Sequence, residues 1–279
     1  MVLEAIIKSR FALTHPLAML FFAIAITTVS MGISIATFPD YSSVLCIAFI
    51  TIGSMPVLFQ IFTQEETEEA EHPASPATFL ERHFNIISVF VFLFIGIAIT
   101  YCFWYLYLPT ELGETIFAEQ DKNLERIGQL RGQATAGAAL MACESHDFWA
   151  LSLSCIFANN AVVLIWSLIL AFFYGAGAIF LIAWNASVVG IAVGQEILVN
   201  GLSGGLIRAI GLIPHGIFEI GGYVVGAIAG GIISAAIAKK IYLKKEFEII
   251  IKDVIILVII AFILVLLGAL LEGFLLLSG

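Results

Sequence analysis

An imidazole and a carboxylate lie one helical turn apart in a strongly apolar part of the chain. The stretch GLIPHGIFEI, residues 211–220, places His215 and Glu219 four residues apart, and side chains with this spacing share one face of a helix. Pro214 suits a first helical turn, where the helix dipole favours the neutral form of His215. A neutral imidazole can accept a proton or bind a metal ion. Three roles follow: a hydrogen-bonded structural latch, a proton or ion site, or metal-assisted or acid–base catalysis.

Other polar side chains interrupt the apolar runs and are predicted to join this pair. Ionisable groups in lipid are costly, so they usually face the interior of a helix bundle. Asn185 is expected to bond to a neighbouring helix. The predicted polar cluster contains His215, Glu219, Glu272, Asn160, Asn159, Asn185 and Glu196.

The depth of these residues in the membrane can be estimated from the helical rise of about 1.5 Å per residue. On this count His215 lies at the outer rim of its span, Glu219 lies about 7 Å further in, and Glu272 returns to the outer rim. Asn159 and Asn160, counted from residue 148, come near mid-membrane. We therefore expect two levels, a titratable outer layer and an amide layer beneath it.

A metal site is the most specific of the three roles and has the least support in the sequence. Zinc hydrolases need a third ligand and usually a base, and the chain contains no HExxH motif. His215, Glu219 and Glu272 are the candidate ligands for a divalent metal. No cofactor is otherwise predicted.

Composition indicates the elements that must carry these residues. Of 279 residues, 61% are hydrophobic and 12% are charged, and the mean hydropathy is +1.07, whereas soluble domains carry about 25% charged residues. Several apolar runs reach the roughly 20 residues that cross a bilayer. The pattern predicts an all-α, polytopic membrane helix bundle in the lipid bilayer. The net charge of −9 by itself says little about nucleic acid, but the chain has no basic patch to bind it, so no nucleic-acid partner is expected.

We predict about seven transmembrane helices and three regions. The regions are an N-terminal three-helix membrane part, 1–107, an extracytoplasmic amphipathic segment, 108–147, and a four-helix membrane core, 148–279. The predicted spans are 16–38, 42–62, 86–107, 148–173, 175–199, 214–238 and 254–278.

Lysine and arginine decide the orientation. A lysine cluster, residues 239–252, falls between the last two spans. It predicts a multi-pass cell-membrane protein with a cytoplasmic N-terminus and an extracytoplasmic C-terminus.

The segment 108–147 has an amphipathic part. The residues Ile116, Phe117, Gln120, Leu124, Ile127 and Leu130 recur at helical spacing, and charged residues occupy the other side. Such a helix either caps the bundle at the outer membrane surface or docks an extracytoplasmic protein partner.

Glycines recur every four residues in the sixth predicted span, at Gly222, Gly226 and Gly230. Small residues at this spacing let helix backbones approach closely. Packing within the chain, a homodimer and a glycine-lined permeation path are the alternatives.

Three stretches together resemble the stage II sporulation protein M family over residues 148–278. They are FWALSLSCIFANN, 148–160, GAGAIFLIAWNASVVG, 175–190, and PHGIFEI, 214–220. Glu272 in the last span also fits this resemblance, whereas Ala186 stands where the family commonly has glycine. The resemblance implies a polytopic membrane protein. In spore formers it implies a role in engulfment, assembling peptidoglycan-degrading enzymes at the membrane.

Three functions follow from these observations. The first is a membrane scaffold or assembly protein whose outer surface, 108–147 and the 200–213 loop, holds a partner. The alternatives are a proton- or ion-coupled transporter or channel, and a metal-dependent intramembrane hydrolase. No nucleophile with an adjacent base is evident, so an enzyme is not favoured.

Overall fold

The computed structural model describes residues 9–71, 76–125, 148–174, 178–243 and 247–278. These ranges are almost entirely helical and contain no strand, so the predicted all-α bundle is confirmed. The elements are α1 (Ser9–Thr14), α2 (Leu17–Thr37), η2 (Pro39–Tyr41), α3 (Ser42–Glu71), α4 (Pro76–Tyr107), α5 (Thr110–Ile116), α7 (Phe148–Tyr174), α8 (Ala178–Ala238), η3 (Ile241–Leu243) and α9 (Phe247–Ser278).

Within these ranges six helical stretches are long and apolar enough to cross a membrane. They lie in α2, α3, α4, both halves of α8 and α9, and a shorter apolar stretch, Ile156–Phe172, lies in α7. The chain is therefore a multi-pass membrane protein, in agreement with about seven predicted spans. Lys239, Lys240 and Lys252 lie at the α8–α9 end of the bundle, but which end faces the cytoplasm stays a prediction.

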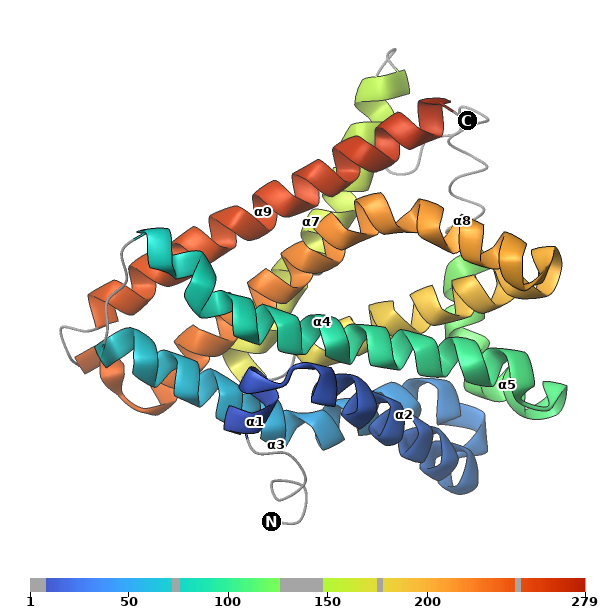
Figure 1. Ribbon diagram of the computed structural model, residues 1–279, viewed down its shortest axis with the longest axis horizontal. Helices are drawn as coiled ribbons and strands as arrows, with labels where there is room; N and C mark the ends of the chain where they lie inside the picture. Colours follow the sequence, from blue (N-terminus) through green and yellow to red (C-terminus); the bar gives the residue numbers. More distant parts are fainter. Residues whose placement is uncertain (1–8, 72–75, 126–147, 175–177, 244–246, 279) are drawn as a thin grey trace.

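The helices stack in layers, with α2 and α3 on one side, α4 and α8 in the middle, and α7 and α9 on the far side (Figure 1). Contacts between α2 and α4 fix their relative direction. Gly96 of α4 faces Leu20 and Ala23 of α2, and eight residues on, Trp104 donates to Thr28 over 3.4 Å. Both contacts advance together along the chain, so α2 and α4 run in parallel.

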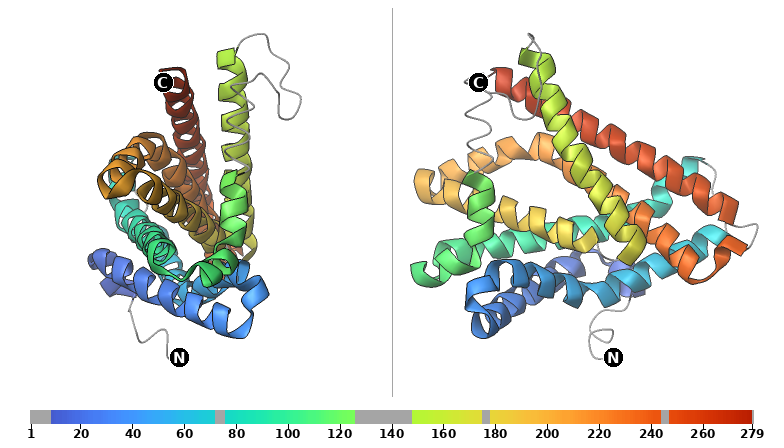
Figure 2. Two further views of the ribbon diagram at one scale, coloured as in Figure 1. Left: turned by 90° about the vertical axis from the view of Figure 1, so that its right-hand side faces the viewer. Right: turned by 180° about the vertical axis from the view of Figure 1, so that it is seen from behind.

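The long helix α8 is a hairpin of two arms. At Gly201 the backbone has φ 70° and ψ 170°, which is not helical, and the second arm returns past the first (Figure 2). In the first arm Gly190 faces Ala98 of α4 and Gly194 faces Tyr105, so this arm runs parallel to α4. The second arm contains the predicted sixth span.

Because Gly201 has a positive φ, replacing it should destabilise the protein even where there is room for the added methyl group. Nothing lies within 4 Å of a methyl group added at Gly201 or at Gly211. Gly201→Ala should nevertheless cost roughly 1–2 kcal/mol of unfolding free energy, because L-residues are strained at positive φ. Gly211 is helical, so Gly211→Ala should instead stabilise by up to about 1 kcal/mol. Thermal unfolding in detergent measures both variants, and equal shifts of the midpoint would contradict the strain at Gly201.

The described half of the amphipathic segment covers one end of the bundle. Ile116, Phe117 and Gln120 are buried, as their helical spacing predicts. Residues 118–125 are also helical, and Phe117 packs against the rings of Tyr101 and Tyr105 in α4. Ile127 and Leu130 of the predicted amphipathic helix lie outside the described residues. As far as residue 125, the predicted amphipathic segment is therefore helical and covers this end of the bundle, and we call this part the cap.

Candidate functional site

The predicted His–Glu pair lies in the second arm of α8, and an amide from α7 reaches it. Asn160 is 7% exposed, and its Nδ2 donates a 2.6 Å hydrogen bond to Oε1 of Glu219. His215 is partly buried one turn earlier, with its Nδ1 atom buried. A carboxylate acceptor makes this bond stronger than one between neutral groups. The contact joins two helices whose bonded residues are 59 positions apart.

α9 closes the site from a third side. A methyl group added at Gly268 would lie 2.6 Å from Cγ of Glu219 and 3.3 Å from the backbone oxygen of His215. Only a glycine lets the α9 backbone pass this close to the α8 face that carries the pair. Glu272 follows one turn after Gly268 and is partly buried. Three helices therefore meet around Glu219.

Tyr223 is a member of this site that the sequence pattern did not indicate. It lies four residues after Glu219, is 6% exposed, and lies within electrostatic reach of the carboxylates of Glu219 and Glu272. His215, Glu219 and Tyr223 thus form an i, i+4, i+8 row on one helix face. The spacing of this row could have indicated Tyr223 from the sequence. An aromatic residue in an apolar run is, however, ordinarily a core residue.

The expected separation into two levels is wrong for Asn160. The 2.6 Å bond from Asn160 to Glu219 brings their side chains together, so these two residues cannot occupy separate layers. The depth count placed the membrane boundary at residue 148, but a helix can extend beyond the bilayer before its apolar part begins. Asn160 therefore belongs to the same layer as Glu219.

The remaining predicted amides have other partners. Asn159 is exposed and donates to Oδ1 of Asn160 over 3.2 Å. Asn185 donates to the carbonyl of Leu181 in its own helix over 2.8 Å, so the prediction of a bond to a neighbouring helix is wrong. A short polar side chain can satisfy its donor on the preceding helical turn. That local bond leaves Asn185 outside the cluster.

Glu196 lies near the end of the first α8 arm, where its Oε2 accepts a 2.8 Å bond from Asn200. Among the described residues no three His, Cys, Asp or Glu side chains lie close enough together to hold one metal ion. The candidate ligands His215, Glu219 and Glu272 therefore do not form a ligand set. The geometry offers a carboxylate bound to an amide, with a phenol and an imidazole on the same face.

The three glycines singled out in the second α8 arm face different helices. A methyl group added at Gly222 would lie 2.6 Å from Cγ2 of Val265 and 2.9 Å from the carbonyl of Ala261, both in α9. Gly226 and Gly230 instead face α7, Gly226 against the side chain of Leu164 and Gly230 against the backbone of residue 168. One small-residue row therefore serves two interfaces within the chain.

These contacts also give the direction of α7. Asn160, Leu164 and residue 168 advance along α7 as Glu219, Gly226 and Gly230 advance along α8. α7 and the second arm of α8 therefore run in parallel. α9 runs opposite to both, since Gly268 faces Glu219 whereas the earlier Ala261 faces the later Gly222.

The family comparison covers the whole of this site. The sequence matches the family described as stage II sporulation protein M over residues 86–275, which are 190 of the 279 residues. The chain belongs to the stage II sporulation protein M family. This confirms the resemblance seen over 148–278 and extends it back into α4, which packs against the first α8 arm. Neither a curated protein nor a solved structure matches the chain.

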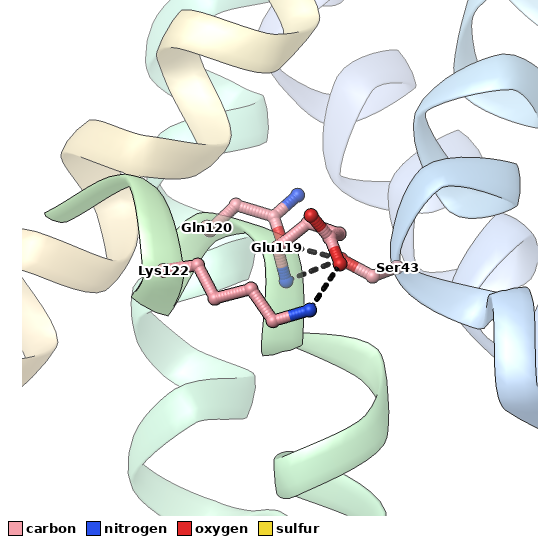
Figure 3. A network of polar contacts seen from close by, with 4 residues as sticks. All are labelled: Ser43, Glu119, Gln120 and Lys122. Carbon is pink, nitrogen blue, oxygen red and sulfur yellow. Dashed lines mark hydrogen bonds and ion pairs between the residues drawn. The ribbon is translucent and has the colours of Figure 1, made fainter. Parts of the chain in front are cut away.

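A second polar cluster, which we call the cap clasp, joins the amphipathic cap to the membrane helices. Ser43 in α3 donates a 2.7 Å bond to Oε1 of Gln120, and the backbone N–H of Glu119 donates to the Ser43 hydroxyl over 3.2 Å. Figure 3 shows Ser43 beside Glu119 and Gln120, with Lys122 bound to Glu119 at 2.7 Å. Part of the clasp thus extends outside the family match, because Ser43 precedes residue 86.

The clasp continues to α8 through Asp121. Its Oδ1 accepts a 2.9 Å bond from Nε2 of Gln195 and a 3.5 Å contact from the hydroxyl of Tyr105. Loss of solvation on partial burial raises the pKa of Asp121, and nearby Glu125 adds to the rise, whereas the bonds from Gln195 and Tyr105 oppose it. The cap therefore bonds to α3, α4 and α8 at one end of the bundle.

The raised pKa of Asp121 predicts a pH dependence of stability. A carboxyl whose pKa is higher in the folded state binds its proton more tightly there than in the unfolded chain. Its contribution is therefore present at low pH and is lost as pH rises from about 4, the unfolded value, through the folded pKa. Asp121→Asn should remove this decline, because an amide oxygen can still accept from Gln195. Melting temperatures from pH 4 to 7 test this, and parallel profiles of the two proteins would contradict it.

Proposed function

We propose that this member of the stage II sporulation protein M family is a non-enzymatic membrane assembly protein. Its binding element would be the turn between the two α8 arms, residues 198–213, which we call the α8 turn. The predicted orientation places this turn at the outer membrane surface. The partner would be a membrane-associated protein that offers an apolar segment to the turn.

The exposure of the α8 turn is the observation that carries this proposal. Six aliphatic side chains on it are between 46% and 81% exposed, namely Leu198, Val199, Leu202, Leu206, Ile207 and Ile210. Exposed apolar side chains gathered in one stretch of chain can mark a protein–protein or a membrane contact, and five of these six lie in the apolar stretch Ile179–Ile207. The turn joins the two arms at the end of the hairpin, at the right of Figure 1. An assembly protein needs an exposed surface of this kind to contact its partner.

The polar cluster would act as a latch for this turn. Pro214 begins the second membrane stretch of α8 directly after the turn, and Glu219 is five residues further on. The Asn160–Glu219 bond and the close approach of Gly268 support a role in which α7 and α9 hold the base of the turn. A fixed base limits the conformational entropy that the turn would lose on binding.

Site-specific photocross-linking in native membranes tests the proposal. A photoreactive residue at Ile207 should give a discrete adduct with one other protein, while the same residue at Ile259 should not. Ile259 is 53% exposed on the membrane-spanning α9 and is a matched control for contact with lipid. The Ile207 adduct should disappear when Leu202→Gln is added, if the contact depends on the apolar surface.

Three outcomes would overturn the proposal. Adducts at Ile207 that contain only lipid would mean that the turn lies in the bilayer without a protein partner, whereas adducts of twice the chain mass would indicate a homodimer. Proton or cation flux through reconstituted liposomes, abolished by Glu219→Gln, would replace the assembly role by transport.

A further inference from the structure

Asp121 links the cap to the first α8 arm within the cap clasp. Its Oδ1 accepts from Nε2 of Gln195 over 2.9 Å and from the hydroxyl of Tyr105 over 3.5 Å. The ring of Tyr105 packs against Phe117 of the cap, with ring centroids 5.2 Å apart, and its Cδ1 would lie 2.9 Å from a methyl group added at Gly194. One carboxylate and one aromatic ring therefore hold the end of this arm against the cap.

The charges on the cap itself disfavour the ionised form of Asp121. Asp121 is half-buried, and both of its described hydrogen-bond donors belong to neutral side chains. Glu125 follows four residues later on the same helix face, where like charges repel each other. Lys122 is the one cation in residues 110–125, and its ammonium group binds Glu119 at 2.7 Å (Figure 3). The clasp therefore brings Asp121 no dedicated cation from the cap.

The elements packed against the cap add further titratable groups. Among the side chains that the structure describes, they bring no cation to the cap, and their titratable groups there are Asp40 of η2, Tyr101 and Tyr105 of α4, and Glu196 of α8. In this setting the pKa of Asp121 is raised, first by loss of solvation and also by Glu125, against the opposing bonds from Gln195 and Tyr105. The docked cap thus favours a protonated Asp121.

We propose that protonation of Asp121 controls how tightly the cap holds the first α8 arm, so that the cap docks most firmly in acid and opens more often near neutral pH. An open cap returns the carboxylate to water. Docking therefore has its full strength below about pH 4, the usual titration range of an aspartate, and weakens as pH rises through the value for the docked cap.

Opening of the cap also reaches the α8 turn. Gln195 lies three residues before Leu198, where the α8 turn begins, so loss of the bond to Asp121 frees the arm that leads into the turn. As a regulation of partner binding, this step rests on the assembly role proposed above.

Hydrogen–deuterium exchange of the full-length protein in detergent tests this inference. The helix α5 has seven residues, which are too few for a stable helix away from the bundle, so its amides exchange when the cap opens. Protection factors are corrected for the intrinsic pH dependence of exchange. We expect those of residues 110–125 to fall about threefold between pH 4 and pH 7. Residues 195–200 of α8 should lose protection in parallel.

Three conservative variants assign the effect to Asp121. Asp121→Asn should make the protection independent of pH, because an amide oxygen can still accept from Gln195. Glu125→Gln should reduce the pH dependence, since it removes the like charge one turn away. Glu114→Gln is the matched control, because Glu114 is an exposed glutamate of α5 outside the clasp, and it should leave the pH dependence unchanged.

Each part of the proposal can fail by itself. An equal fall of protection in the wild type and in Asp121→Asn would overturn the control by Asp121. Equal effects of Glu125→Gln and Glu114→Gln would assign the pH dependence to the net charge of the cap and overturn it too. A fall confined to residues 110–125 would disprove the link to the first α8 arm. A missing adduct at Ile207 would remove the assembly role and leave these exchange results as they are.

Discussion

Replacing Asn160 with alanine is expected to lower the free energy of unfolding by about 2 kcal/mol, because hydrogen bonds to charged groups contribute roughly 1.5–3 kcal/mol. Neutral polar pairs between membrane helices contribute less, about 0.6 kcal/mol on average. The carboxylate of Glu219 and the 2.6 Å distance favour the higher value. Glu219→Gln should cost less than Asn160→Ala, since an amide oxygen still accepts from Asn160.

A double-mutant cycle separates this bond from the loss of packing. Asn160→Ala, Glu219→Ala and the double variant should show a coupling energy of about 1–2 kcal/mol, as expected for residues in one hydrogen-bonded network. Asn159→Ala is the matched control, because Asn159 is exposed and bonds only to its neighbour Asn160 in the described contacts. Equal losses for Asn159→Ala and Asn160→Ala, measured by detergent unfolding, would rule out Glu219 as the reason for the loss.

The cycle also bears on the proposed assembly role. If the latch holds the base of the α8 turn, Asn160→Ala should reduce the yield of the photocross-link at Ile207, although no residue of the turn is substituted. A full-strength adduct in a destabilised Asn160→Ala protein would mean that the turn holds its position without the latch. The stability of the site and its effect on binding are thus measured separately.

The helical periodicity of apolar residues, and the high free energy of polar groups in lipid, explain which features of the fold could be predicted from the sequence. The helical bundle follows from apolar runs that must satisfy their backbone groups internally. The placement of His215 and Glu219 on one helix face follows from a spacing of four residues. Asn160 was expected in the cluster because an amide in an apolar run needs a partner, and Glu219 is that partner.

What could not be predicted depends on how helices are placed against one another. The depth of Asn160 depends on where the bilayer boundary crosses α7, and no single-helix count supplies this position. The spacing of Tyr223 from Glu219 was visible in the sequence, but its approach to Glu272 arises only because α8 and α9 meet there. Gln120 was expected on the apolar face of the cap, and the hydroxyl of Ser43, 77 residues away, gives it a polar contact in that buried position. Distant pairings of this kind are properties of the assembled fold.

Gly190→Ala is expected to have the largest effect of a single methyl group, a loss of about 3 kcal/mol in unfolding free energy, the upper end for overpacking. The added carbon would collide with the carbonyl oxygen of Ala98 and lie 2.9 Å from Cβ of Tyr101. Both contacts involve α4 atoms at or next to the backbone, which cannot rotate away. The clash would push the first α8 arm from α4 and pull Gln195 away from Asp121 in the cap clasp.

Gly32→Ala is the control that isolates this steric effect. Gly32 lies in the membrane-spanning helix α2, and nothing lies within 4 Å of a methyl group added there. Alanine is the better helix former by up to about 1 kcal/mol, so Gly32→Ala should leave the protein as stable as the wild type or more stable. Because the two substitutions are chemically identical, opposite shifts of the unfolding midpoint would assign the loss to the α4–α8 contact. A loss at Gly190 no larger than the change at Gly32 would mean that α4 and the first arm lie further apart than this packing requires.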